Sequence, residues 1–178
     1  MRQANTGYLA LALLLGLAQA ALAADLPSFS GTWQPDRAAS TQSKELKKTV
    51  DPNAPPAPPA PSASIQEKLP AMRITHAEPK LTIEFLEPDG AVISTTAVTT
   101  DGKEALNARA GGALTHRSTS TWDGDVLVTT WSLERAGAVV ISGVDRLELT
   151  SSTTLVVTTT TEDSKSRSKS AIVYRRAS

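Results

Sequence analysis

The sequence predicts an all-β protein, an antiparallel up-and-down meander of about eight or nine strands that forms a closed or nearly closed barrel. Three observations support this prediction. From residue 65 onward, short runs alternate apolar and polar residues, as strands with one buried face do. Asp-Gly and related turns separate these runs roughly every 10–14 residues. This spacing leaves no room for crossover helices, so consecutive strands must be antiparallel neighbours, and closure removes the two bare edges of the sheet.

Residues 1–23 have the features of a cleavable secretory signal peptide. Arg2 gives a basic start, Tyr8 to Leu17 is a continuous apolar run, and Ala21-Leu22-Ala23 is an A-x-A cleavage site. The apolar core of about 10–12 residues is short for a bilayer span, which needs roughly 20. We therefore expect one mature domain, residues 24–178, that is periplasmic or secreted and has no membrane span after cleavage.

The first part of the mature chain contains an aromatic cluster and a proline-rich segment. Phe29-Ser30-Gly31-Thr32-Trp33 predicts a first strand at Gly31 to Trp33, and residues 43–48 favour one or two helical turns. Residues 51–61 hold six prolines, which fix φ and remove amide donors. This segment is expected to be an extended polyproline loop outside the sheet, either a stiff surface loop or a surface for a protein partner.

The remaining strands are expected between recurrent turn residues. The clearest is 80–86, where Leu81, Ile83 and Phe85 fall on one face before the Glu87-Pro88-Asp89-Gly90 turn. The full set of runs is 70–76, 80–86, 91–100, 114–122, 126–134, 138–150, 154–162 and 168–176.

The apolar residues of these strands are sufficient for one core, although few of them are aromatic. The residues expected to point inward are Leu81, Ile83, Phe85, Leu127, Trp131, Leu133, Val139, Ile141, Leu147, Leu149, Leu155, Val157, Ile172 and Val173. Many other strand positions carry Ser, Thr, Ala or Gly. A barrel of about eight strands is either filled by side chains or holds one small ligand. Both arrangements are compatible with these small residues.

Composition excludes several classes of partner and site. Basic and acidic side chains balance at 18 each, which gives no overall attraction for nucleic acid. The absence of cysteine excludes a disulfide frame, a thiolate metal site and a thiol nucleophile. The two histidines, His76 and His116, stand in no metal-binding spacing, so neither a metal nor a cofactor is predicted.

No catalytic residue is predicted. No serine lies in a G-x-S-x-G motif. Asp145 shares the strand parity of Ile141 and Leu147, so a buried Asp145 would require a partner.

The Gly31-Thr32-Trp33 triplet followed by a β-meander resembles the lipocalin and avidin (calycin) superfamily. In that superfamily a tryptophan of a G-x-W motif plugs the closed end of the barrel, and an arginine near the last strand packs over its ring. The resemblance implies that Trp33 is a structural plug and that Arg175, or its neighbour Arg176, is the arginine.

A second resemblance covers more of the chain and is to a group of uncharacterised bacterial exported proteins. The motifs that carry it are Phe29-Ser30-Gly31-Thr32-Trp33, Ser40, Ile74-Thr75-His76, Thr99-Thr100-Asp101-Gly102-Lys103-Glu104, Trp122-Asp123-Gly124-Asp125 and Asp145-Arg146. It implies a lipocalin-like β-barrel without an established activity.

Three functions remain open. The first is an exported module that holds an apolar or amphipathic small molecule inside the barrel, with Phe85, Trp122, Trp131, His76 and His116 as candidate ligand contacts. The second is an envelope protein that binds a protein partner through its proline-rich segment or a sheet face. The third is a hydrolase or isomerase that uses the histidines or a buried carboxylate within the barrel.

Overall fold

The computed structural model describes residues 26–46 and 69–177. The expected signal peptide at residues 1–23 and the expected proline-rich loop at residues 51–61 lie outside these ranges, and both stay predictions.

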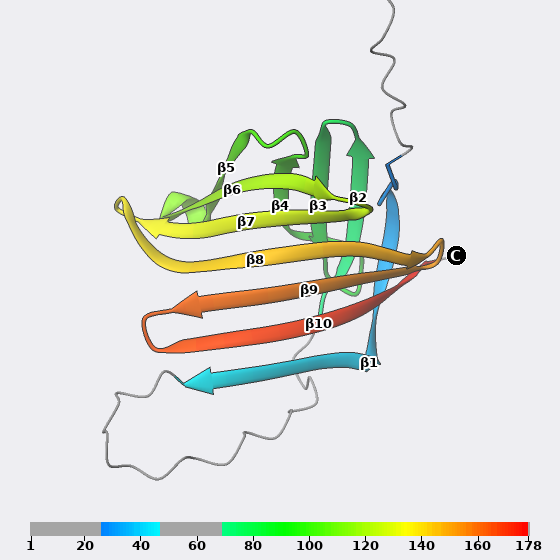
Figure 1. The fold of residues 1–178 in the computed structure, drawn as a ribbon. Coiled ribbons are helices and arrows are strands. Elements are labelled where there is room, and N and C mark those ends of the chain that lie inside the picture. The colour runs from blue at the N-terminus through cyan, green and yellow to red at the C-terminus, as the bar shows by residue number, and fades with distance from the viewer. Residues whose placement is uncertain (1–25, 47–68, 178) are drawn as a thin grey trace, which may run out of the picture.

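Ten strands form one antiparallel sheet in the described residues, ordered β4-β3-β2-β1-β10-β9-β8-β7-β6-β5. The sheet curls into a nearly closed barrel, which confirms the predicted fold class (Figure 1). The strands are β1 (Gly31–Leu46), β2 (Ala71–Ala77), β3 (Lys80–Leu86), β4 (Val92–Thr99), β5 (Glu104–Arg109), β6 (Leu114–Asp123), β7 (Val126–Arg135), β8 (Ala138–Ser151), β9 (Thr154–Asp163) and β10 (Ser166–Arg176). One 3₁₀ turn, η1 (Ala110–Gly112), joins β5 to β6.

Strand β1 joins the two parts of the barrel. Its first residues pair with β2, from Gly31 opposite Ile74 onward, and from Trp33 onward the strand pairs with β10, with a break between Asp36 and Thr41. A bulge after Asp36 bends the strand, and the Ser40 hydroxyl fills the break by donating to the Asp36 carbonyl (2.7 Å) and accepting from the Val173 amide (3.0 Å). Figure 1 shows β1 turning away from β2 to run beside β10.

Two sequence expectations about these strands are wrong. Residues 43–46 are not helical but form the end of β1, where the long-range ladder with β10 outweighs local helix propensity. The described residues also form ten strands in place of the expected eight or nine, because β5 lies between two expected strands. Its sequence, Glu-Ala-Leu-Asn-Ala-Arg, contains none of the β-branched or aromatic residues that are typical of strands.

Strands β4 and β5 end the sheet, and side chains link them where the backbone ladder stops. The Asn107 amide accepts a hydrogen bond from the Ala97 amide and donates one to the Ala97 carbonyl, each at 2.8 Å. The Thr99 hydroxyl donates to the Lys103 carbonyl (2.9 Å), and Arg109 binds the Thr95 carbonyl (3.2 Å). We call this contact the β4–β5 seam. It closes the barrel without a continuous ladder.

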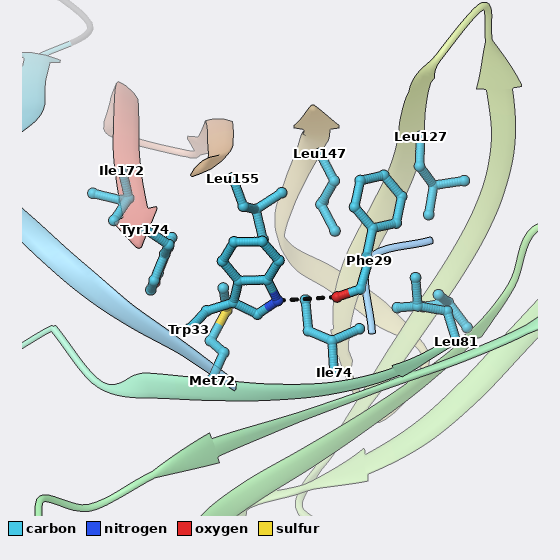
Figure 2. Close-up of a cluster of buried hydrophobic side chains, with 11 residues drawn as sticks. Phe29, Trp33, Met72, Ile74, Leu81, Leu127, Leu147, Leu155, Ile172 and Tyr174 are labelled. Atoms are coloured by element: carbon cyan, nitrogen blue, oxygen red, sulfur yellow. Dashed lines mark hydrogen bonds between the residues drawn. The ribbon is translucent and has the colours of Figure 1, made fainter. Parts of the chain in front are cut away.

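The hydrophobic core fills one end of the barrel, which we call the closed end. Trp33 and Phe29 lie at its centre and are fully buried, and the Trp33 indole donates a hydrogen bond to the Phe29 carbonyl (2.9 Å; Figure 2). The buried residues of this cluster are Phe29, Trp33, Met72, Ile74, Leu81, Val98, Leu127, Leu147, Leu155, Ile172 and Tyr174. The alternation of each strand sends these residues to the same side of the sheet.

Two residues expected to point inward, Val139 and Val173, do not do so. Val139 is 60% exposed because a register shift after Leu133 places it near the end of the β7–β8 hairpin. Val173 lies between the buried Ile172 and Tyr174, and successive strand residues point to opposite faces, so it cannot share their side of the sheet.

Candidate functional site

A cavity of about 340 Å³ lies inside the barrel, between the β3–β4 hairpin and the wall formed by β6, β7 and β8. At about 30 Å³ per water molecule, this volume corresponds to roughly ten waters. The lining residues are Leu81, Ile83, Phe85, Thr96, Val98, Arg109, His116, Leu127, Thr129, Trp131, Leu133, Asp145 and Leu147. The barrel interior is therefore filled at the closed end and hollow beside it.

Most of the lining is apolar, and its origin is the period-two alternation of the strands. Leu81, Ile83 and Phe85 come from one face of β3, and Leu127 and Leu133 come from one face of β7. This apolar surface favours the hydrocarbon part of a ligand.

Arg109 is the cationic group of the cavity. Its guanidinium donates to the Thr95 carbonyl (3.2 Å) and to the Thr96 hydroxyl, which anchors it at the β4–β5 seam. Burial lowers the pKa of Arg109. Burial, and then the charge of Arg109, lower the pKa of His116, which favours the neutral imidazole.

Asp145 is the acidic group of the cavity. Burial raises its pKa, and the side chains of Thr159 and Trp131 oppose that rise only in part. Its Oδ1 atom is buried and has no hydrogen-bond partner among the described residues, and the same holds for Trp131 Nε1. In the described chain no salt bridge reaches this carboxyl group. The cavity thus contains a carboxyl group that has one unsatisfied oxygen and no ion-pair partner among the described residues, beside an indole N–H without a well-formed hydrogen bond.

Gly143 leaves the space that the Trp131 ring occupies. The two residues are partners in the β7–β8 ladder. A Cβ atom on residue 143 would lie 2.5 Å from Trp131 Cζ2 and 2.7 Å from the Thr160 carbonyl oxygen. The indole therefore packs directly over the glycine backbone, which fixes the place of the ring in the wall.

Three of the five predicted ligand contacts line the cavity. Phe85, His116 and Trp131 come together there, and the His116 and Trp131 rings lie 5.7 Å apart at 35°. Trp122 and His76 do not line the cavity but lie together at the closed end, with their ring centroids 6.0 Å apart. Whether any of the five contacts a ligand stays a prediction.

His76 and Trp122 belong to a hydrogen-bonded network that anchors the N-terminal segment. The Glu78 carboxylate accepts from His76 Nε2 and Trp122 Nε1, each at 3.0 Å, and from the Thr100 hydroxyl. Phe29 stacks on both rings and donates its backbone amide to His76 Nδ1 (3.4 Å). Burial raises the pKa of Glu78, but its three hydrogen bonds lower it by more. Every polar ring atom here has a partner, which indicates a structural role.

The arginine over Trp33 is Arg176 and not Arg175. The Arg176 guanidinium carbon lies 4.3 Å from the centroid of the Trp33 ring, and the group donates to the Ser30 carbonyl (2.6 Å). Arg175 points to the other face of β10 and pairs with Asp36 (3.1 Å). The assignment of Arg175 to the barrel plug is corrected accordingly, and alternation along the strand explains the difference.

Arg109 is the charged cavity residue that the sequence did not indicate. It lies on β5, whose composition conceals a strand. The one indication was position, because residues 104–109 follow the Asp101-Gly102 turn and precede a clear strand, as the first arm of a hairpin would.

A second hollow of about 760 Å³ lies where β1 separates from β2. Its lining is Thr32, Gln34, Pro35, Arg37, Leu69, Pro70, Ala71, Leu86, Glu87, Pro88, Gly90 and Ile93. None of the unsatisfied buried side-chain atoms of the described residues belongs to it. The cavity inside the barrel is therefore the better candidate site.

In the described residues, no group of His, Asp or Glu is arranged to hold a metal ion. None of the helices in that part of the chain has the length and apolar character needed to cross a bilayer.

No protein-family model and no curated protein sequence match the chain. Among solved structures, it is similar to zebrafish ileal bile acid-binding protein in complex with cholic acid, with 17% identity and a TM-score of 0.46 over 84% of this chain and 98% of that one. It is also similar to a variant of the fluorescent protein UnaG, with 19% identity and a TM-score of 0.47 over 84% of this chain and 96% of that one. Neither likeness bears on the ligand of this chain.

Proposed function

We propose that the protein is an exported small-molecule-binding module that holds an apolar or amphipathic ligand in the cavity inside its barrel. The observation that carries this proposal is a cavity of about 340 Å³ with a mainly apolar lining and a few convergent polar groups. Known ligand pockets have this composition, and their volumes begin at about 300 Å³. Phe85, Trp131 and His116 are the proposed ligand contacts. Export is proposed from the basic start, apolar core and A-x-A site of residues 1–23.

Ligand binding is tested by filling the cavity with a larger side chain and measuring the loss of affinity for a dye. Leu133 lines the cavity, whereas Val139 is exposed on β8, so Leu133→Trp and Val139→Trp form a matched pair. N-phenyl-1-naphthylamine, a small apolar dye that fluoresces when it leaves water, is titrated into each protein. We expect Leu133→Trp to weaken dye binding by about tenfold or more, because the new indole occupies the cavity. Val139→Trp should bind as the wild type does.

Equal dye binding by the wild type and both variants would contradict the proposal, as would no binding by the wild type. Circular dichroism shows whether Leu133→Trp has kept its fold. Native mass spectrometry of protein purified from its own envelope fraction then seeks a bound mass that is lost on denaturation. Comparison of the processed N-terminus with Ala24 tests export.

A further inference from the structure

Among the described residues, four buried side-chain polar atoms without hydrogen-bond partners lie on one wall of the barrel. They are His116 Nδ1, Ser118 Oγ, Trp131 Nε1 and Asp145 Oδ1, and they come from the adjacent strands β6, β7 and β8. Buried polar groups in folded proteins nearly always have a partner, either protein or bound solvent or ligand. A concentration of unsatisfied groups in one place therefore calls for a partner that the chain does not supply.

The ladder register shows how these groups are arranged. Ser118 lies opposite Trp131, which lies opposite Gly143, and these three form one row across the wall. Asp145 is in the next row, opposite Thr129. The row beyond that pairs Leu127 with Leu147 and belongs to the apolar closed end. The unsatisfied groups thus form a polar belt directly beside the hydrophobic core.

Three residues of this belt, His116, Trp131 and Asp145, line the cavity, and Trp131 and Asp145 have opposite hydrogen-bonding character. An indole N–H only donates, and the free Oδ1 atom of a carboxylate accepts. The Trp131 indole lies near the Asp145 carboxyl and lowers its pKa as a weak hydrogen-bond donor does, against the larger effect of burial. The geometry between them does not satisfy either Trp131 Nε1 or Asp145 Oδ1, and both atoms remain open to a better partner. Gly143 holds the indole in the wall, so the donor is fixed before a ligand arrives.

We infer that the ligand of this cavity carries a neutral hydroxyl or carboxamide group, which donates a hydrogen bond to Asp145 and accepts one from Trp131. This inference rests on the proposed function and names the chemical class of its ligand. A hydroxyl oxygen provides both interactions from one atom. The apolar lining, including Ile83, Phe85 and Leu133, holds the hydrocarbon part of the molecule.

Other head groups satisfy the belt less well. Arg109 offers a carboxylate a cation in the same cavity, but a carboxylate at the belt would place a second negative charge beside Asp145, and like charges at close range repel. An ammonium group would pair with Asp145 but would leave the Trp131 N–H unsatisfied and would share the cavity with the Arg109 cation. An ether accepts from Trp131 but cannot donate to Asp145. A buried group left unpaired in this way is the usual source of discrimination between similar ligands.

The test compares ligands of one chain length that differ in the head group. Isothermal titration with the purified protein measures octan-1-ol, octanamide, methyl octyl ether, octanoate and octylamine. We expect octan-1-ol and octanamide to bind about fivefold to tenfold more tightly than the other three. The comparison of octan-1-ol with methyl octyl ether isolates the hydrogen bond to Asp145, because both contain the oxygen that Trp131 would bind.

Two variants test whether the polar belt causes the preference for octan-1-ol over methyl octyl ether. Asp145→Leu removes the acceptor, so the ratio of the affinities for octan-1-ol and methyl octyl ether should fall to about one. Trp131→Phe removes the donor but keeps an aromatic ring. It should lower the affinities for octan-1-ol and methyl octyl ether by the same factor. If Asp145→Leu does not fold, Trp131→Phe and the wild-type ligand series still test the head-group assignment.

Failure of this inference differs from failure of the proposed function. If the ether, octanoate or octylamine binds as tightly as octan-1-ol, the head-group assignment is wrong although the cavity binds ligands. If no ligand of the series binds, and the dye does not bind either, the proposed function itself fails. A preference for octan-1-ol that survives Asp145→Leu would also overturn the assignment.

Discussion

Asp145 occupies an unfavourable place for an ionised side chain. It projects from β8 into a largely apolar cavity, and no salt bridge to a described residue balances its charge. Burial raises its pKa above the ordinary value of 3.8. A charged group in such a site is seldom retained for stability, because an apolar replacement is usually neutral or stabilising. Its presence is therefore better explained by what the cavity holds than by the fold.

The first prediction concerns Asp145→Asn and pH. Below pH 3.8 the carboxyl is protonated in both the folded and the unfolded state. As the pH rises, the unfolded chain releases the proton first, so the free energy of unfolding falls until the pH passes the raised pKa of the folded state. Asparagine does not titrate. Relative to the wild type, the variant should gain stability as the pH rises from about 3 to 7.

Thermal unfolding followed by circular dichroism across this pH range measures the gain. Asp125→Asn, in the exposed β6–β7 turn, is the control variant for the same substitution at the surface. If the difference in stability between Asp145→Asn and the wild type stays constant with pH, the folded protein does not disfavour the charged form of Asp145, and the prediction is wrong.

The second prediction concerns the contact between Gly143 and Trp131. Gly143→Ala inserts a methyl group at 2.5 Å from the indole and 2.7 Å from the Thr160 carbonyl, so the ring must shift. Overpacking of this kind costs about 1–3 kcal/mol of unfolding free energy. Chemical denaturation measures the loss, and Val144→Ala, at the neighbouring outward position, should change stability much less. Equal losses would refute a specific clash with the ring.

At the scale of elements, the residues that lead into β1 and the last residues of β10 together close one end of the barrel. Gly31 has φ of +144°, a conformation that favours glycine, and a side chain there would collide with the Arg176 guanidinium. The Arg176 side chain covers Trp33 and also binds the Ser152 carbonyl (2.9 Å). The closed end is therefore held by residues from both ends of the described chain.

The third prediction compares Arg176→Ala with Arg175→Ala. Loss of Arg176 removes the contact with Trp33 and two hydrogen bonds from a charged donor to carbonyl oxygens, and it should cost about 2 kcal/mol of unfolding free energy. Arg175 makes an exposed pair with Asp36, and such surface pairs contribute little to stability, so Arg175→Ala should cost less than Arg176→Ala. Urea denaturation of both variants provides the comparison. A larger loss for Arg175→Ala would contradict the assignment of Arg176 to the plug.

The elements differ in how far the sequence predicts them. Strands such as β3, with strict alternation and a turn at each end, follow from local pattern. Strand β5 and the long second half of β1 do not, because tertiary pairing selects them against local propensity. The same limit applies to the cavity. Phe85 and Trp131 are suggested by their size and parity, whereas the approach of Arg109 and Asp145 to one cavity depends on the curvature of the sheet.

At the scale of the whole molecule, the β4–β5 seam is the weakest closure of the barrel. Other neighbouring strands share backbone ladders, whereas this seam depends on side chains, chiefly those of Asn107 and Arg109. Each of the two Asn107 hydrogen bonds replaces a ladder bond that a continuous sheet would have. Local opening of the barrel is expected here before it occurs elsewhere.

The fourth prediction tests the seam with Asn107→Leu, which keeps the size of the side chain and removes both hydrogen bonds to Ala97. Amide hydrogen exchange at Ala97 and in β5 should become faster, because the opening of the seam costs less free energy. The amides of β8 and β9 should keep their protection. Leu106→Ala, an exposed change on the same strand, is the control. Exchange that accelerates equally in all strands would indicate global destabilisation instead.

The seam also has a consequence for the behaviour of the protein in concentrated solution. An opened seam would expose strand edges of eight and six residues, bordered by the exposed side chains of Val92 and Ile93 on β4 and Leu106 on β5. Unpaired edges with apolar side chains recruit other chains into intermolecular sheets. Asn107 and Arg109 therefore have a role beyond the cavity, in whose lining only Arg109 takes part. By holding the edges of β4 and β5 against each other, they protect each molecule from forming intermolecular sheets with its neighbours.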